Sequence, residues 1–519
     1  MSSRKLKLLK VSKLQKGPKN KIIRNCATVT STATDVKPFE SMPGPPGSGL
    51  PFIGHTNLFG KKPAGIGKSW ENIKECRNQF LKEDDKLMRL NLPPFNPEGQ
   101  GKFVFLLDPN DVEQIYRHEG KYPNRGNGFE AFKLMREARQ DIFGETTGVL
   151  MEEREKWYDI RSKIQQDLMR PRSAHFYLDE IQEVADDFMD FIRSQRSPEK
   201  IIKDCLPEIY RFTFESISLI ALDTRLGCLK VPMDPDIAKT FQASKRLLES
   251  FLPLIQWPTW KFLPPRWNKT FRNAQADTDI LLNFGKKKVD EATKRIFDDN
   301  IQDSHEMSVL QKLILRNGPN SSYPLVTAID MIFAGIDTTG NTLGFLMYHL
   351  ATNPDKQEKL QKECQSLGDC LSVKSLNELR YLKACIQESN RLTPTIALMV
   401  RLIPEEFNLH GYQIPKKTMM AWSPMLFREQ FKDWDKFIPE RWIDNRIEKS
   451  ICPHAVRQFS FGPRMCVGKR FADMELLIVM HKMMHNFDLK WVNEDPMTIS
   501  QVLVNVPDQS LDFQFNDLK

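Results

Sequence analysis

The sequence lacks the features that mark several large classes of protein. No run of eighteen apolar residues occurs among its 519 residues, so a membrane-spanning helix is not expected. The nine cysteines form no CxxC pair, and their odd number and scattered spacing argue against a disulfide scaffold or a zinc ribbon. With 40% hydrophobic and 27% charged residues, the composition is that of a globular protein with ample material for a large core.

Acidic residues are missing from the start of the chain. Residues 1–34 carry nine lysines and arginines and no aspartate or glutamate, whereas the whole chain has a net charge of +8. The remainder is therefore near −1, which gives no bulk signal for nucleic-acid binding. A basic, Ser/Thr-bearing leader without a long apolar segment predicts an organelle transit peptide, disordered, over residues 1–40. A disordered basic tail without a targeting role is the alternative.

The rest of the chain is predicted to be mainly helical with a small antiparallel β component. Prolines and glycines at 43–47 separate the leader from the body. Helical periodicity dominates residues 152–312, interrupted at 253–267 by prolines and aromatic residues that predict an irregular surface segment. Other elements are predicted as a strand at 102–109, short strands within 400–460, and helices at 108–120, 323–353, 375–392 and 468–486.

One cysteine stands in an unusual setting. In the stretch FSFGPRMCVGKR, residues 459–470, Cys466 lies between Gly462 and Gly468 and follows Arg464. It could be half of a disulfide, a zinc ligand or a lone thiolate that binds a cofactor, and the cysteine spacing disfavours the first two. A thiolate on haem iron needs close backbone approach, which glycines permit, and a helix start that stabilises its charge. An arginine nearby suits a haem carboxylate, so the pattern favours the third role.

The stretch AGIDTTG, residues 334–340, places glycine, aspartate and paired threonines inside a predicted helix. Such residues weaken a helix interior or compete for its backbone hydrogen bonds. The pattern is either a tolerated kink or a local opening of the helix. In the second interpretation Asp337 and Thr338 deliver protons to bound oxygen.

Two further motifs are weak when taken alone. Glu388 and Arg391 in ESNR share a helix face, which by itself indicates only a surface ion pair. Trp157 and Arg161 in WYDIR lie one helical turn apart, as in many amphipathic helices.

Together these motifs resemble the cytochrome P450 family of haem-thiolate monooxygenases. The resemblance implies the cytochrome P450 fold as a single domain over residues 41–519, with haem b between the long central helix and the cysteine-bearing loop. It implies Cys466 as the axial iron ligand, whose electron donation favours O–O cleavage, and Asp337 with Thr338 as the catalytic acid–alcohol pair. It also implies a structural cluster and further cofactor-binding residues: Glu388, Arg391 and Arg441 in the cluster, and Phe459, Gly462, Arg464, Gly468, Trp157, Arg161, Arg401 and Ala334 at the haem.

The basic leader is similar to that of the animal mitochondrial branch of the family. That branch takes electrons from an acidic iron–sulfur ferredoxin and its reductase, so a local basic docking patch is expected. Lys383, Lys469 and Arg470 are its candidates, whereas Gln387 stands where the branch usually has a second lysine. The resemblance implies a peripheral protein on the matrix side of the inner membrane, with the endoplasmic reticulum as the alternative.

The resemblance implies insertion of one atom of O2 into a lipophilic substrate: a sterol, steroid, fatty acid or foreign compound. The pocket is expected along residues 126–148, 325–333, 395–399 and 499–504, with an apolar lining that includes Phe333, Ile396, Leu398 and Met399. Two alternatives remain. One is a related haem-thiolate isomerase or dehydratase that does not use O2, and the other is a haem-binding sensor that does not turn over.

Overall fold

The computed structural model describes most of the chain after residue 35. The described residues are 36–50, 54, 55, 58, 69–93, 96, 98–126, 128–256, 259–261, 264, 267–298, 307–443, 454, 456–501 and 503–518. The predicted leader lies outside the described residues except for 36–40. Within the described part, no helix combines the length and the apolar character needed to cross a membrane.

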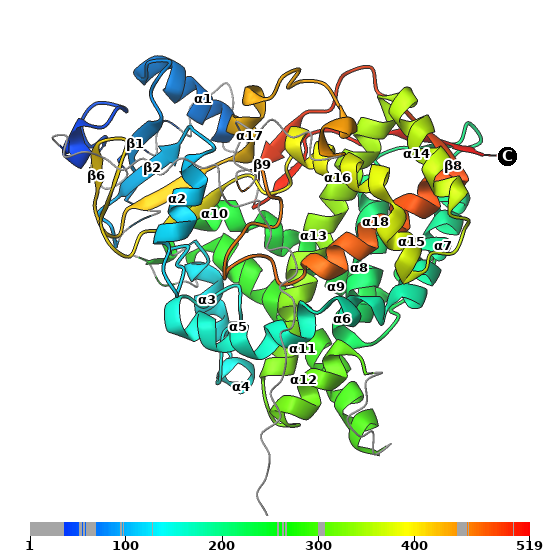
Figure 1. The fold of residues 1–519 in the computed structure, drawn as a ribbon. Helices are drawn as coiled ribbons and strands as arrows, with labels where there is room; N and C mark the ends of the chain where they lie inside the picture. The colour runs from blue at the N-terminus through cyan, green and yellow to red at the C-terminus, as the bar shows by residue number, and fades with distance from the viewer. Residues whose placement is uncertain are drawn as a thin grey trace, which may run out of the picture.

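Helices make up most of the molecule (Figure 1). The α-helices are α1 (Ser69–Phe80), α2 (Asp111–His118), α3 (Glu130–Glu137), α4 (Gln140–Phe143), α5 (Arg154–Leu168), α6 (Pro171–His175), α7 (Leu178–Gln195), α8 (Leu206–Leu222), α9 (Pro235–Glu249), α10 (Phe251–Gln256), α11 (Lys269–Asp298), α12 (Val309–Asn317), α13 (Tyr323–Ala351), α14 (Pro354–Ser366), α15 (Val373–Glu378), α16 (Arg380–Leu392), α17 (Pro424–Phe427) and α18 (Lys469–Asn486). Short 3₁₀ turns lie at Phe39–Ser41, Thr259–Lys261, Arg428–Gln430 and Pro439–Trp442.

The strands form small sheets, the largest of which lies to one side of the helices (Figure 1). Its order is β1-β2-β7-β4, from β1 (Leu87–Asn91), β2 (Lys102–Leu106), β7 (Met419–Trp422) and β4 (Met399–Leu402). The β component was predicted to be antiparallel, and one pair departs from this: β2 and β7 are parallel, with Phe103 opposite Met419. The other sheets are β3-β11-β8, from β3 (Ile201–Ile202), β11 (Phe513–Asp517) and β8 (Phe487–Trp491), and the pairs β9 (Ile499–Gln501) with β10 (Asn505–Pro507) and β5 (Phe407–Leu409) with β6 (Tyr412–Ile414).

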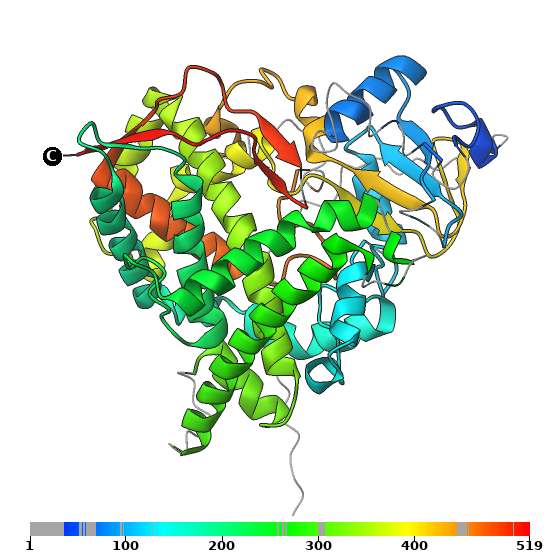
Figure 2. The ribbon, with the colours of Figure 1, turned by 180° about the vertical axis from the view of Figure 1, so that it is seen from behind.

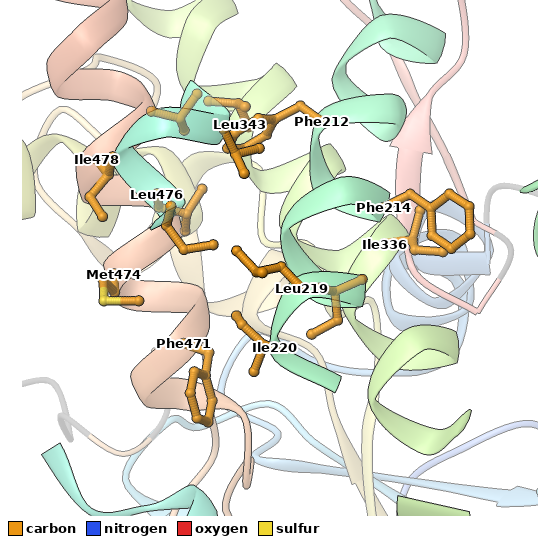
Figure 3. Close-up of a cluster of buried hydrophobic side chains, with 14 of the residues drawn as sticks. Phe212, Phe214, Leu219, Ile220, Ile336, Leu343, Phe471, Met474, Leu476 and Ile478 are labelled. Atoms are coloured by element: carbon orange, nitrogen blue, oxygen red, sulfur yellow. The ribbon is translucent and has the colours of Figure 1, made fainter. Parts of the chain in front are cut away.

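Helix α13 lies at the centre of the molecule and is buried on nearly all sides. A helix that is apolar around its whole circumference requires neighbours on every face. Helix α8 packs along it, and Figure 3 shows Phe212 and Leu219 of α8, Ile336 of α13 and Leu476 of α18 in one apolar cluster. Seen from behind, α9 and α11 run across the remaining side (Figure 2). The long helix predicted at 323–353 is thus confirmed to within two residues.

The helix predicted at 375–392 is wrong as a single element. It is two helices, α15 and α16, separated at Leu379, whose φ and ψ are −66° and 66°. Glu363 of α14 accepts hydrogen bonds from the backbone amides of Tyr381 and Leu382, at 2.7 and 2.9 Å. A carboxylate from a distant helix therefore caps the second helix start, which no local pattern reveals.

Candidate active site

A cavity of about 590 Å³ lies inside the molecule and is lined both by α13 and by the loop that carries Cys466. Ala334, Asp337 and Thr338 contribute from α13, and Phe459, Arg464 and Cys466 from the loop. The two main motifs of the sequence therefore meet at one cavity, although about 130 residues of chain separate them.

The Cys466 loop has a fixed backbone. The Cys466 amide donates a hydrogen bond to the Phe459 carbonyl at 3.0 Å, and the Met465 amide donates to the Gly462 carbonyl at 3.1 Å. Gly462 has φ 78°, and an ideal Cβ there would lie 2.6 Å from Oε1 of Glu119. Only glycine meets both conditions without strain. The loop thus presents the Cys466 thiol toward the cavity.

Gly468 plays a different part from Gly462. It is the N-cap of α18, its φ is −84°, and an ideal Cβ would lie 3.9 Å from Sγ of Cys466, an ordinary contact. Burial raises the pKa of the Cys466 thiol, while the Gly468 amide and the Arg161 charge act in the opposite direction. The loop thus offsets only part of the cost of burying a thiolate, and a bound metal ion would supply further stabilisation.

Arginines gather along the cavity wall next to this loop. Arg464 donates to Glu153 Oε1 and to the Glu152 carbonyl, both at 2.7 Å, and its guanidinium stacks 4.6 Å from the Trp157 ring centroid. Its Nε is buried without a partner among the described residues. Arg161, predicted from the WYDIR motif, also lines the cavity and donates to Gln165 at 3.4 Å.

Their electrostatics indicate an anionic occupant. Burial lowers the pKa of Arg464 to about 9 and that of Arg161 to about 10, and in each case the charge of Arg125 adds to the effect. Buried cations that repel one another are stabilised by a bound anion. The two carboxylates of haem, next to an iron-binding thiol, match this set of groups, so the residues present fit haem b.

Arg125 is a candidate cofactor-binding residue that the sequence did not single out. It lines the same cavity, its Nε is buried without a partner in the described part of the chain, and burial lowers its pKa. It lies between α2 and α3 and precedes Gly126, whose φ is 73°. A lone arginine beside a glycine is the only sequence signal, and it is too common to identify a site.

Arg401 is already neutralised within the protein. It lines the cavity, but its Nε lies 2.5 Å from Glu119 Oε2 and it donates to the Val400 carbonyl at 2.8 Å and to the Ser460 hydroxyl at 3.3 Å. Because Glu119 balances its charge, Arg401 offers an anion less than Arg125 or Arg161 does.

The AGIDTTG segment remains helical, so the predicted local opening of α13 is wrong for this structure. The Thr338 hydroxyl donates to the Ala334 carbonyl at 2.6 Å, alongside the intact backbone ladder. Its glycines serve packing: ideal Cβ atoms on Gly335 and Gly340 would lie 2.7 Å from Ile217 and 2.5 Å from Tyr210, both of α8. The close approach of α8 therefore supports the helix where its sequence is weak.

Asp337 is a buried acid at the cavity. Its side chain is 5% exposed, and burial raises its pKa to about 7. Two charges of α9 act on it in opposite directions, since Lys245 lowers the pKa and Glu249 raises it. A carboxyl with a pKa near 7 can take up and release a proton at neutral pH.

Glu388, Arg391 and Arg441 form one cluster. Glu388 is fully buried, accepts two hydrogen bonds from Arg391 at 2.8 and 2.9 Å, and lies 3.3 Å from Nε of Arg441. It also accepts from the Ile438 amide at 2.9 Å and the Trp442 indole at 2.8 Å. The Glu388 carboxylate thus joins α16 to the segment that precedes the Cys466 loop.

Replacing Glu388 with glutamine is expected to lower the free energy of unfolding by about 3–5 kcal/mol, because Arg391 and Arg441 would remain buried without a counter-charge. Urea unfolding followed by circular dichroism measures the change. Glu358→Gln is the control, since Glu358 pairs with Lys362 at an exposed position on α14 and should leave stability nearly unchanged. Equal losses in the two variants would contradict this role for the cluster.

Most of the remaining cavity wall is apolar. Phe333, Ile396, Leu398 and Met399 all line it, and each of the four predicted segments contributes. The segment predicted at 253–267 to be irregular and on the surface is partly wrong, because α10 forms there. Residues of both α9 and α10 also line the cavity: Leu248 of α9, and Phe251, Leu252 and Ile255 of α10.

The predicted basic patch is only partly at the surface. Nζ of Lys383 is half-buried and donates to the Leu376 and Asn377 carbonyls at the end of α15, at 2.7 and 3.2 Å. Lys469 pairs with Asp473 one turn further along α18, and Arg470 is exposed. Of these candidates, Arg470 is thus the best placed to meet an acidic partner.

Comparisons with known proteins point to one family. A family model described as cytochrome P450 matches residues 43–513. The chain is 32% identical to cytochrome P450 CYP12A2 of Musca domestica over 448 residues, which cover 81% of this chain and 82% of that protein. It is 30% identical to the probable cytochrome P450 12a5, mitochondrial, of Drosophila melanogaster, over 93% of this chain and 91% of that protein. It is 31% identical to cytochrome P450 12b1, mitochondrial, of Drosophila acanthoptera, over 79% of each.

Proposed function

Because this chain belongs to the cytochrome P450 family, whose members are monooxygenases that hold haem b on a cysteine thiolate, we propose that it is a mitochondrial member. Its electrons come from an acidic iron–sulfur ferredoxin and the reductase of that ferredoxin. Residues 41–519 act as the haem domain, and residues 1–40 act as the transit peptide. The names of similar proteins from Drosophila and the absence of acidic residues from 1–34 support this location. The protein then lies peripherally on the matrix side of the inner membrane.

The observation that carries the proposal is the shared cavity of Cys466, Asp337 and Thr338. Cys466 would bind the haem iron through its thiolate, and Arg125, Arg161 and Arg464 with Trp157 would hold the haem carboxylates. Phe459 and Ala334 would also contact the bound haem. Glu388, Arg391 and Arg441 keep the preceding segment in place.

Bound haem supplies the centre at which O2 is activated. The protein supplies protons to that centre while keeping bulk water out of an apolar cavity. The carboxyl of Asp337, whose pKa burial raises to about 7, can hold and release a proton at neutral pH. The Thr338 hydroxyl, whose own hydrogen points to the Ala334 carbonyl, keeps its oxygen lone pairs free to accept a proton and can then pass one on. Overall the reaction consumes O2, two electrons and two protons, and yields hydroxylated substrate and water.

The substrate is lipophilic, in the class of sterols, steroids, fatty acids and foreign compounds. Burial of such a molecule against Phe333, Ile396, Leu398 and Met399 removes its apolar surface from water, worth about 25 cal/mol per Å². This lining does not require a charged substrate.

Ferredoxin dependence gives the test of the proposal. An acidic [2Fe–2S] ferredoxin is expected to reduce the haem at a rate that falls as salt is added, because screening weakens the attraction of opposite charges. Arg470→Glu should slow reduction several-fold in stopped-flow measurements at low salt, whereas Lys287→Glu on α11 should not. Turnover should consume O2 in step with product. A rate indifferent to salt and to Arg470, or product formed without O2, would contradict the proposal.

A further inference from the structure

Two of the polar side chains that line the mainly apolar cavity come from the same stretch of α13. Thr327 and Asp330 lie on α13, three residues apart and therefore on one face of the helix, and both line the cavity. Thr327 is 2% exposed and Asp330 is 4% exposed. Their neighbours on this wall include Met331 and Phe333.

Asp330 is held in place by contacts with Arg136 and with the loop at residues 147–150. Arg136 of α3 donates from Nη1 to Asp330 Oδ1 at 2.6 Å and from the same nitrogen to the Thr147 carbonyl at 2.7 Å. Gly148, with φ 103°, lies against this pair, and an ideal Cβ there would meet Asp330 Oδ2 at 2.5 Å and Arg136 Nη1 at 2.6 Å. A glycine is therefore required for the loop to close over the carboxylate.

These contacts do not use every hydrogen-bonding position of Asp330, which lines the cavity. Within the described residues its acceptor contacts are Arg136 and backbone amides of the loop, one of which, Leu150, is 3.4 Å from Oδ2. A carboxylate offers about four acceptor positions, so at least one remains unused. One turn earlier, Oγ1 of Thr327 is buried with no partner among the described residues. An unpaired buried hydroxyl is costly unless a ligand or water completes it.

Fold stability alone does not account for the buried ion pair between Asp330 and Arg136. Replacing a buried ion pair with apolar side chains of similar volume is often neutral or stabilising. A strictly apolar substrate would moreover leave Asp330 and Thr327 desolvated without compensation. A substrate with one polar group at this point would satisfy both.

We propose that Asp330 and Thr327 form a polar anchor for the substrate, and that the substrate is a lipophilic molecule bearing a neutral hydroxyl group. The hydroxyl donates to Asp330. A neutral donor is favoured over a cation because Arg136 already balances the charge of Asp330, and a further unpaired charge in a dry cavity would be costly. This inference rests on the proposed monooxygenase function, whose substrate it narrows.

The anchor also sets where oxidation occurs. Asp330 precedes Thr338 by eight residues of continuous helix, which is roughly 12 Å along the axis at 1.5 Å per residue. A substrate held by its hydroxyl at Asp330 therefore presents a carbon at the far end of the molecule to the Thr338 end of the cavity. The oxygen is inserted remote from the existing hydroxyl.

Probe ligands of one chain length test the anchor in the haem-loaded protein. The set is 1-dodecanol, 1-methoxydodecane, dodecyltrimethylammonium and dodecanoate, with binding measured by the haem spectral shift and by equilibrium dialysis. Dodecanol is expected to bind about tenfold more tightly than the methyl ether, the size of one hydrogen bond to a charged group. The proposal would be overturned if the ammonium compound or dodecanoate bound most tightly. Tightest binding of dodecanoate would mean that Arg136, rather than Asp330, binds the polar end of the ligand.

Variants separate the anchor from a purely structural pair. Asp330→Asn leaves Arg136 without a counter-charge and is expected to destabilise the fold, so the paired variant Asp330→Leu with Arg136→Met removes both charges together. In the paired variant the preference for dodecanol should fall to within about twofold, and Thr327→Val should weaken it in part. The control is Asp279→Leu, which breaks the ion pair between Arg139 and Asp279 of α11. Neither of these residues lines the cavity. A preference unchanged in the paired variant would overturn the anchor.

The proposed function and the anchor fail in different ways. Loss of haem-thiolate spectra or of O2-dependent turnover in the wild-type protein would count against the function. Normal spectra and turnover without discrimination between dodecanol and its methyl ether would count against the anchor alone.

Discussion

Replacing Cys466 with serine is expected to abolish the red-shifted Soret band of the reduced, CO-bound protein and to abolish turnover. The band reports a thiolate on the iron, and a serine hydroxyl in the same loop does not ionise at neutral pH to replace it. The effect should be complete rather than graded, because Cys466 is the one cysteine that lines the cavity within the described residues. Difference spectroscopy of the reduced protein with and without CO measures it.

The control for this variant is Cys370→Ser, which changes an exposed cysteine that does not line the cavity. The buried thiols are unsuitable, since Cys364 and Cys385 are fully buried and their replacement would disturb packing. Cys370→Ser should keep the band and its intensity. Survival of the band in the Cys466 variant would remove the basis for the ligand assignment, and with it the proposed roles of the surrounding arginines.

The parts of the site that could be predicted are those whose chemistry constrains neighbouring residues in the chain. The Cys466 loop needs a positive φ at Gly462 and a following helix, and both requirements leave a local sequence pattern. The same is true of α13, where glycines and threonines inside an apolar helix are conspicuous. In such cases the spacing of a few residues carries most of the information.

The parts that could not be predicted depend on contacts between distant segments. Arg125 becomes a site residue only because its loop folds over the cavity, and nothing in its own surroundings distinguishes it. The division between α15 and α16 depends on Glu363 from α14. The intact helix at AGIDTTG depends on α8 packing against Gly340. Local propensity is overridden by tertiary packing in each case.

Replacing Asp337 with asparagine is expected to lower turnover by about 10²-fold or more while leaving the CO-bound spectrum unchanged, because the loss affects proton delivery rather than iron ligation. O2 should still be consumed, with a smaller share of it appearing as product. Asp337→Glu restores a carboxyl and should recover part of the coupling. Substrate hydroxylation measured against O2 consumption gives the result, and normal coupling in the asparagine variant would contradict the acid role.

The pH dependence of coupled turnover tests the same group by a second route. The pKa of Asp337 is raised to about 7, so the carboxyl is mostly protonated below that pH and loses its proton as the pH rises through it. Coupled turnover should therefore fall above about pH 7 in the wild type and be flat in Asp337→Asn.

The two α9 charges allow matched shifts of opposite sign. Lys245→Met removes a charge that lowers the pKa and should move the midpoint to higher pH, whereas Glu249→Gln should move it lower. Unchanged midpoints in both variants would mean that another group controls the pH profile. Shifts in opposite directions would assign the profile to Asp337.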